Sequence, residues 1–278
     1  MSAPGRLGSE FHAATFTHEG RTHEVFRAGA GPGVVIVHEV PGLHPGVVEF
    51  GRRLIDAGYT VYLPSLFGRP GQAPTTAAVV RSIVRVCIAR EFSILADRTS
   101  PVASWLRGLA IKAHTECGGP GVGAVGMCLT GGFALAMAVE PAVLAPVVSQ
   151  PGLPAPLTAR KRAALGLDPG DLAAIRERAQ RGLCVLGLRF SNDKGCPAER
   201  FETLRHALGD AFEGIEIDSS PGNPFGIPTR AHAVLTVDLV DEPGHPTRAA
   251  LDRVLAFLNQ RLRPQDPSKR NDAPPPSR

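Results

Sequence analysis

Cys128 combines a reactive thiol with small neighbours, and residues 125–132 read VGMCLTGG at a predicted junction between a strand and a helix. A turn that projects a nucleophile from such a junction is tight, so it needs small residues two positions before and after the nucleophile. Gly126 meets this need and Thr130 comes close. A helix starting at Leu129 would point backbone N–H groups and its positive dipole end at the sulfur, which favours the thiolate. The pattern predicts a nucleophile elbow, with a buried structural cysteine as the alternative.

The glycines before Cys128 also match the spacing of a dinucleotide-binding loop, Gly121-x-Gly123-x-x-Gly126. That loop must follow a strand, open a helix and be followed by an acidic residue about 20 positions on. Here the glycines lead into and through the predicted strand, and the nearest acid downstream is Glu140. We therefore predict no nucleotide cofactor, and the chemistry expected of Cys128 needs no metal or organic cofactor.

Asp193 follows the apolar run LCVLGLRF at residues 183–190, so we expect it just past the end of a buried strand. A carboxylate that accepts the Nδ1–H of an imidazole fixes the tautomer of the ring. It also stabilises the imidazolium that forms during acyl transfer. The sequence Ser-Asn-Asp before Pro197 equally suits an Asx turn or a helix N-cap, which is the structural alternative.

Two histidines, His232 and His245, compete for the role of the base. Both follow the last predicted strand, which gives the order nucleophile, acid, base along the chain. His245 directly precedes Pro246, a residue suited to the first turn of the final helix, so His245 can also belong to that helix start. Either one could be an ordinary surface histidine, since the chain has nine.

These residues need a scaffold in which buried strands alternate with helices. Short β-branched runs predict strands, and stretches with a helical period predict helices. Strands are predicted at residues 34–38, 60–63, 122–127, 143–149, 183–190 and 214–218, and helices at 46–57, 77–90, 101–113, 129–139, 198–208 and 246–262. This alternation indicates the α/β class, with a mostly parallel central sheet and helices on both faces.

Residues 16–262 are predicted to form one folded domain, within which residues 150–181 are a looser stretch. Residues 1–15 lack periodicity and are expected to be a flexible N-terminus. Residues 263–278 are Pro-rich and polar with nothing to bury, so we expect a disordered tail.

The composition of the 278 residues, 43% hydrophobic and 20% charged, suits a folded chain with an ample core. The formal net charge is +4 and no run of basic residues is interleaved with aromatic ones, so no nucleic acid partner is expected. No stretch approaches about 18 consecutive apolar residues, so no membrane partner is expected. The N-terminus lacks the apolar core of a secretion signal, and the five cysteines are scattered without a Cys-x-x-Cys. We expect reduced thiols in a cytoplasmic monomer or homodimer.

Three segments together resemble the dienelactone hydrolase family, a branch of the α/β-hydrolase fold with a cysteine nucleophile. They are HEVPGL at residues 38–43, the elbow GMCLTGGF at residues 126–133, and the acid and then the histidine after the last strands. The resemblance implies an α/β-hydrolase fold. It also implies that Glu39 lies close to Cys128 and helps to control its ionisation.

The same resemblance implies an oxyanion hole formed by the backbone N–H groups of Val40 and Leu129. His232 is preferred to His245 as the base, because its distance from the end of the last helix is closer to the spacing in the family. The implied activity is hydrolysis of a small-molecule ester or lactone through an acyl-enzyme, with a Cys-His-Asp triad that starts at Cys128.

Some positions depart from the family pattern. Thr130 stands in place of a glycine, and the loop at residues 219–230 is longer than expected for the family. Arg90 is a candidate anion contact, with a solvated arginine at a helix end as the alternative. These departures point to a small ester or lactone other than a dienelactone as the substrate. A glutamine amidotransferase would pair its cysteine with His-x-Glu, which neither His232 nor His245 provides. The alternative from another class is a non-catalytic α/β-hydrolase-like module that binds a small ligand or a partner.

Overall fold

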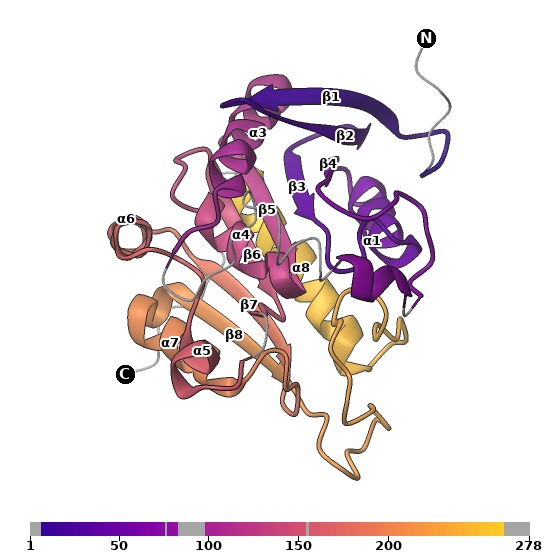
Figure 1. Ribbon diagram of the computed structural model, residues 1–278, viewed down its shortest axis with the longest axis vertical. Coiled ribbons are helices and arrows are strands. Elements are labelled where there is room, and N and C mark those ends of the chain that lie inside the picture. Colours follow the sequence, from indigo (N-terminus) through magenta and orange to yellow (C-terminus); the bar gives the residue numbers. More distant parts are fainter. Residues whose placement is uncertain (1–6, 76, 83–97, 154–155, 264–278) are drawn as a thin grey trace, which may run out of the picture.

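A computed structural model describes residues 7–75, 77–82, 98–153 and 156–263. The strands are β1 (His12–His18), β2 (Arg21–Gly29), β3 (Gly33–Val37), β4 (Thr60–Ser65), β5 (Val122–Met127), β6 (Val143–Ser149), β7 (Val185–Phe190) and β8 (Phe212–Ile217). They form one eight-stranded sheet in the order β1-β2-β4-β3-β5-β6-β7-β8 (Figure 1). β2 is antiparallel to β1 and β4, and the other neighbouring pairs are parallel. The predicted α/β class with a mostly parallel sheet is confirmed.

Helices pack on both faces of this sheet (Figure 1). They are α1 (Pro45–Asp56), α3 (Val102–Cys117), α4 (Gly131–Met137), α5 (Ala159–Ala163), α6 (Pro169–Gln180), α7 (Ala198–Leu208) and α8 (Pro246–Leu262), with 3-10 turns η1 (Cys128–Thr130) and η2 (Gly209–Ala211). Because alternate residues of a strand face opposite sides, Val35 of β3 packs in one core cluster with Trp105 of α3. Val34 packs in the other cluster with Phe257 of α8. The strand ends are therefore held in a fixed order between two buried layers.

Several elements have the predicted bounds. The strands predicted at residues 122–127 and 143–149 and the helices predicted at 198–208 and 246–262 coincide with β5, β6, α7 and α8. Residues 83–90 of the helix predicted at 77–90 lie outside the described residues. The helix predicted at 129–139 is replaced by the turn η1 followed by the shorter α4.

The prediction of a flexible N-terminus over residues 1–15 is wrong for its last part. Residues 12–15 belong to β1, which pairs with β2 through a turn at Glu19 and Gly20. Both turn residues have positive φ, the conformation of a tight hairpin turn. Leu7 and Phe11 are also buried. The hairpin escaped prediction because most side chains of β1 face outward or are half-buried, so their polarity hides the strand alternation.

The stretch predicted to be loose, residues 150–181, contains the helices α5 and α6. α6 buries only Ile175, so its sequence carries little apolar periodicity. Of the tail predicted at residues 263–278, only Arg263 lies within the described residues.

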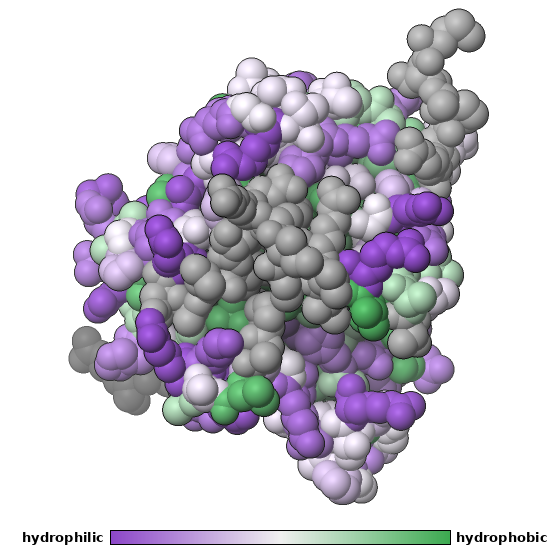
Figure 2. Space-filling view, viewed as in Figure 1, coloured by the Kyte–Doolittle hydropathy of each residue, from purple (hydrophilic) through white to green (hydrophobic). Residues whose placement is uncertain are grey.

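On the face shown in Figure 2, hydrophilic side chains cover much of the described surface and hydrophobic ones form small patches. None of the helices among the described residues combines the length and apolar character that a membrane crossing needs.

Candidate active site

The turn after β5 presents Cys128 in a strained conformation. The φ angle of Cys128 is 56°, in the left-handed region that non-glycine residues seldom adopt. The turn leaves no space at Gly126, where an added Cβ would lie 2.3 Å from the carbonyl oxygen of Thr130. An added Cβ at Gly131 would lie 2.7 Å from the Cα of Pro151. The glycines on either side are therefore required, as a sharp turn between a strand and a helix demands.

Thr130, which stands in place of a glycine, uses its hydroxyl to join two strand ends. The hydroxyl accepts a hydrogen bond from the backbone N–H of Met127 at 3.1 Å and lies 2.8 Å from the carbonyl oxygen of Val37, to which it can donate. Thr130 is completely buried. The departure from glycine thus links the end of β5 to the end of β3.

A cavity of about 850 Å³ opens beside the sulfur of Cys128. It is lined by Val40, Val79, Cys128, Leu129, Gly152, Leu153, Asn192, Asp193, Lys194, Gly195, Thr229, Arg230 and His232. The expected nucleophile, acid and base and both expected oxyanion-hole residues therefore line one cavity. Its walls combine apolar side chains with two cationic ones, Lys194 and Arg230.

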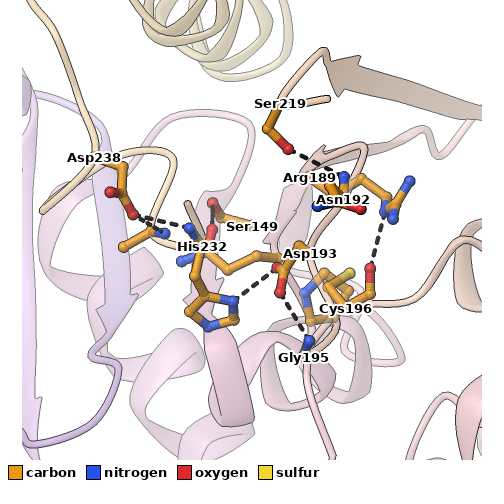
Figure 3. A network of polar contacts seen from close by, with 12 residues as sticks. Ser149, Arg189, Asn192, Asp193, Gly195, Cys196, Ser219, His232 and Asp238 are labelled. Carbon is orange, nitrogen blue, oxygen red and sulfur yellow. Dashed lines mark hydrogen bonds and ion pairs between the residues drawn. The ribbon is translucent and has the colours of Figure 1, made fainter. Parts of the chain in front are cut away.

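His232 and Asp193 form a hydrogen-bonded ion pair at this cavity (Figure 3). Nδ1 of His232 donates to Oδ2 of Asp193 at 2.7 Å. The second carboxylate oxygen accepts the backbone N–H of Gly195 at 2.8 Å. Asp193 is buried at the end of β7, whereas His232 is half-buried. Both carboxylate oxygens are engaged, so the orientation of the imidazole is fixed relative to the strand end.

The charge state of His232 depends on both of its neighbours. Burial alone would lower the pKa of the ring, but the hydrogen bond to Asp193 and the interaction with the sulfur of Cys128 outweigh it and raise the pKa to about 11. At neutral pH the raised pKa of His232 therefore favours the protonated form of the ring.

A second carboxylate, Asp238, holds the backbone around His232. Oδ2 of Asp238 accepts the backbone N–H of His232 at 2.9 Å and that of Ala233 at 2.8 Å (Figure 3). Asp238 was not among the residues expected at the site. In the sequence Asp238 is visible only as an acid six positions after the candidate base. That spacing does not by itself indicate a contact.

His245, the competing candidate, serves the start of α8. Its Nδ1 accepts the backbone N–H of Thr247 at 3.3 Å, and its ring packs edge-on against Phe225. It is the N-cap residue of the helix. The structure therefore brings His232, and not His245, to the cavity that contains Cys128.

Glu39 is buried and bonded to three polar side chains. His44 donates from Nε2 to Oε1 of Glu39 at 3.0 Å, because Nδ1 of His44 already accepts the N–H of Gly46. The hydroxyl of Thr236 also donates to Oε1, and the amide of Gln150 donates to Oε2 at 3.2 Å. The carboxylate of Glu39 is thus hydrogen-bonded to His44, Thr236 and Gln150. The next residue, Val40, lines the cavity. Control of the ionisation of Cys128 by Glu39 stays a prediction.

Among the described residues, no group of three or more His, Cys, Asp or Glu side chains is placed to hold a metal ion. Arg90, the candidate anion contact, lies outside the described residues.

Solved structures with a similar fold include dienelactone hydrolases. The structure of a dienelactone hydrolase from Anabaena variabilis has a TM-score of 0.58 and 17% identity, and the match covers 91% of this chain and 98% of that one. A dienelactone hydrolase-like promiscuous phosphotriesterase from metagenomic libraries has a TM-score of 0.56 and 20% identity, over 89% and 96% of the two chains. These likenesses show the α/β-hydrolase fold.

Sequence comparison gives the family. A Yersinia pestis protein whose name proposes a carboxymethylenebutenolidase is 30% identical over 194 residues, which are 68% of this chain and 66% of the relative. An Escherichia coli K12 protein with the same name is 28% identical over 188 residues, 67% of this chain and 64% of the relative. The chain thus spans just under two thirds of the length of these relatives. The model of the dienelactone hydrolase family matches residues 23–261. The chain belongs to the dienelactone hydrolase family, whose name denotes hydrolases of lactone ester bonds.

Proposed function

We propose that this protein hydrolyses a small ester or lactone through a covalent acyl-enzyme on Cys128, with His232 and Asp193 completing a Cys-His-Asp triad. One observation carries the proposal: the strained elbow presents Cys128 to the same cavity as an imidazole that is bonded to a buried carboxylate. Family membership supports the reaction class. The positions of the three side chains support the roles.

In the acylation step, the thiolate of Cys128 attacks the carbonyl carbon and a C–S bond forms. The carbonyl oxygen becomes an oxyanion. When the intermediate collapses, the C–O bond to the leaving group breaks, and the imidazolium of His232 gives its proton to the leaving oxygen. The raised pKa of His232, about 11, keeps this proton available at neutral pH.

In the deacylation step, the sulfur no longer carries a charge because it is bonded to the acyl group. One cause of the raised pKa of His232 is thereby removed, so the neutral ring can accept a proton from water. The water oxygen attacks the acyl carbon, the C–S bond breaks, and the thiolate and imidazolium are restored. Asp193 keeps the ring oriented throughout.

The oxyanion is proposed to be held by the backbone N–H groups of Val40 and Leu129, both of which line the cavity. Such donors act well when they are fixed before the charge develops. The network around Glu39 supplies that fixation on one side, since three side chains anchor the residue that precedes Val40. We therefore propose that Glu39 acts on the reaction through the peptide it anchors.

We propose that the substrate is a small molecule and that the protein acts as a monomer or homodimer. The cavity suits an ester or lactone with an apolar body, because Val40, Leu129 and Leu153 form part of its wall. Cys117, Cys128, Cys184 and Cys196 are free thiols. Free thiols support the proposal that the protein works in the cytoplasm, where they stay reduced.

The test is to mix the protein with p-nitrophenyl acetate and to record its intact mass at short times. We expect an added acetyl group that maps to Cys128, is absent in Cys128→Ala, and persists longer in His232→Gln. Cys184→Ala is the matched control, because Cys184 is also half-buried but contacts Arg261. An adduct that survives in Cys128→Ala would contradict the proposed nucleophile. If the wild type shows neither adduct nor turnover, while Cys128→Ala binds the same ligands equally well, the non-catalytic module is the better description.

A further inference from the structure

Arg200, in the first turn of α7, is a buried cation with main-chain partners. Only 1% of the residue is exposed. Its guanidinium donates hydrogen bonds to four backbone carbonyl oxygens, those of Ala164, Lys161 and Pro151 at 2.7 Å each and that of Gly195 at 3.3 Å. One side chain therefore joins three separate segments of the chain to α7.

The burial of this charge makes the contacts demanding. A buried cation is costly unless each of its donors finds a partner. Lys161 and Ala164 lie at the C-terminal end of α5, where carbonyl groups point outward and the helix dipole favours a positive charge. Burial lowers the pKa of Arg200, and the carbonyls replace the hydrogen bonds that the buried guanidinium would otherwise make with water. A shift of any one segment would leave at least one guanidinium N–H and one carbonyl without a partner.

The other two partners of Arg200 adjoin the candidate active site. Pro151 precedes Gly152, whose N–H donates to the carbonyl oxygen of Cys128 at 2.8 Å. The N–H of Gly195 donates to Oδ1 of Asp193 at 2.8 Å. The carbonyls of Pro151 and Gly195 are bonded to the same guanidinium nitrogen, Nη1 of Arg200. That nitrogen therefore holds the peptide whose N–H supports the nucleophile, and the carbonyl of the residue whose N–H supports the acid.

The segments that contain Gly152 and Gly195 lie close to each other and to the imidazole of His232. An added Cβ at Gly152 would lie 3.5 Å from the carbonyl oxygen of Gly195 and 3.6 Å from the carbonyl carbon of Cys128. An added Cβ at Gly195 would lie 3.1 Å from Cε1 of His232. The carbon added at Gly152 would make ordinary van der Waals contact, and the one added at Gly195 would be tight against the ring. The two segments are thus near neighbours, and a shift of either one moves the group that its glycine N–H supports, Cys128 or Asp193.

We propose that Arg200 is a positioning residue that sets the separation between the Cys128 elbow and the pair formed by Asp193 and His232. It does so by holding the carbonyls of Pro151 and Gly195 on one nitrogen. The inference rests on the proposed function, because the separation matters only if these side chains react together. The hydrogen bonds of Arg200 go to main-chain carbonyls and not to the sulfur of Cys128 or the imidazole of His232.

The chain offers a matched control in Arg178 of α6. Its guanidinium also donates to four main-chain carbonyls, those of Ala138, Glu140, Pro141 and Val143. These carbonyls lie before and at the start of β6, whereas Pro151 follows the end of that strand. Arg178 is half-buried, whereas Arg200 is fully buried, but it makes the same kind of contacts at the opposite end of β6 from the cavity.

The test compares Arg200→Lys with Arg178→Lys. The kinetic quantities are kcat and KM for p-nitrophenyl acetate. The second measurement is the pH midpoint for alkylation of Cys128 by iodoacetamide, with the alkylated residue identified by peptide mass. The third is the midpoint of unfolding in urea. We expect Arg200→Lys to lower kcat by about tenfold to a hundredfold with KM within about twofold, since small misplacements of reacting groups have effects of this size. We also expect its alkylation midpoint to move to higher pH, because a looser imidazolium stabilises the thiolate less. Arg178→Lys should lower the urea midpoint and leave the kinetic values and the alkylation midpoint unchanged.

Three outcomes would overturn the positioning role. In the first, Arg200→Lys folds and keeps the wild-type kcat and alkylation midpoint. In the second, Arg178→Lys changes kcat and the alkylation midpoint as much as Arg200→Lys does. In the third, neither Arg200→Lys nor Arg200→Gln folds, whereas Arg178→Lys does. Failure of the proposed function looks different, because the wild type would then form no acyl adduct. The alkylation midpoint does not depend on turnover, so it reports the position of His232 in either case.

Discussion

The two halves of the candidate site are built in different ways. The half that contains Cys128 is local, because β5, the turn and α4 follow one another within residues 122–137. The half that contains His232 joins two loops whose paired residues are 39 positions apart in the chain. Steric exclusion around glycines fixes the first half, and hydrogen bonds from Asp193 and Asp238 fix the second. Substitutions of the glycines in the first half should therefore disrupt the backbone, whereas substitutions in the second half should cause graded losses of rate.

The largest expected effect comes from changing the nucleophile alone. Cys128→Ser keeps the shape of the elbow but removes the thiolate, so His232 must now take a proton from a hydroxyl during attack. We expect kcat/KM to fall by about 10³ to 10⁴, the range that such a proton transfer can supply. Steady-state rates on an activated ester measure this. A fall of less than about tenfold would contradict a thiolate mechanism.

A smaller loss is expected from the other half of the site. Asp193→Asn keeps the size of the side chain but removes the negative charge that holds the imidazolium, so kcat should fall by about 10² to 10³. Asp218→Asn is the control, because its exposed carboxylate accepts the N–H of Ser220 at 2.8 Å, outside the cavity. Equal losses in the two variants, measured by kcat, would remove the special role of Asp193.

Gly126→Ala tests the steric half directly. The new Cβ would lie 2.3 Å from the carbonyl oxygen of Thr130, so the turn must open. We expect a loss of about 1–3 kcal/mol in the free energy of unfolding, measured in urea, together with a lower kcat. Gly170→Ala on α6 provides the comparison, since its Cβ would meet only Oδ1 of Asp168, at 3.3 Å. Wild-type stability and kcat in Gly126→Ala would show that the turn is not constrained.

The charge of His232 should make stability depend on pH. Its pKa is raised in the folded protein from 6.5 to about 11, so the stabilisation by the protonated ring is complete below pH 6.5. It is lost as the pH rises through about 11. We expect the urea midpoint of the wild type to fall between about pH 7 and pH 11 more steeply than that of His232→Gln. Parallel curves for the two proteins would contradict the raised pKa.

The smallest expected effect distinguishes the two histidines. His245→Ala removes an N-cap acceptor from α8 and should cost about 1 kcal/mol in the free energy of unfolding, with kcat unchanged. Urea unfolding and initial rates measure the two quantities. A fall of kcat in His245→Ala as large as that in His232→Gln would reopen the choice of base.

The parts of the fold that could be predicted are those with a strong local signal. β5 and β6 are continuous apolar runs and were placed with their observed bounds. The elbow at Cys128 was visible because small residues surround a reactive one. The hairpin of β1 and the helix α6 were missed, since neither buries a clear apolar face.

The candidate site shows the same limit. Chain order and the family resemblance predict Asp193 and His232, and the hydrogen bond between them agrees with that prediction. The contacts of Glu39 with Gln150 and Thr236 could not be predicted, because they join residues 111 and 197 positions apart. The same holds for Asp238 and Arg200, whose roles depend on backbone groups that no sequence pattern marks.

The hydroxyl of Thr130 bears on which parts of this protein can be exchanged. Thr130 lies 2.8 Å from the carbonyl oxygen of Val37 and so ties the end of β3 to the end of β5. Val37 and Gly126 are also register partners in these adjacent parallel strands. The spacing between the chain at Val40 and the chain at Leu129 is thus inherited from the sheet and not from the loops that surround the cavity. Loops from relatives with other substrates could be grafted around this centre with the strand spacing left as it is, which makes the loops the natural targets for directed evolution.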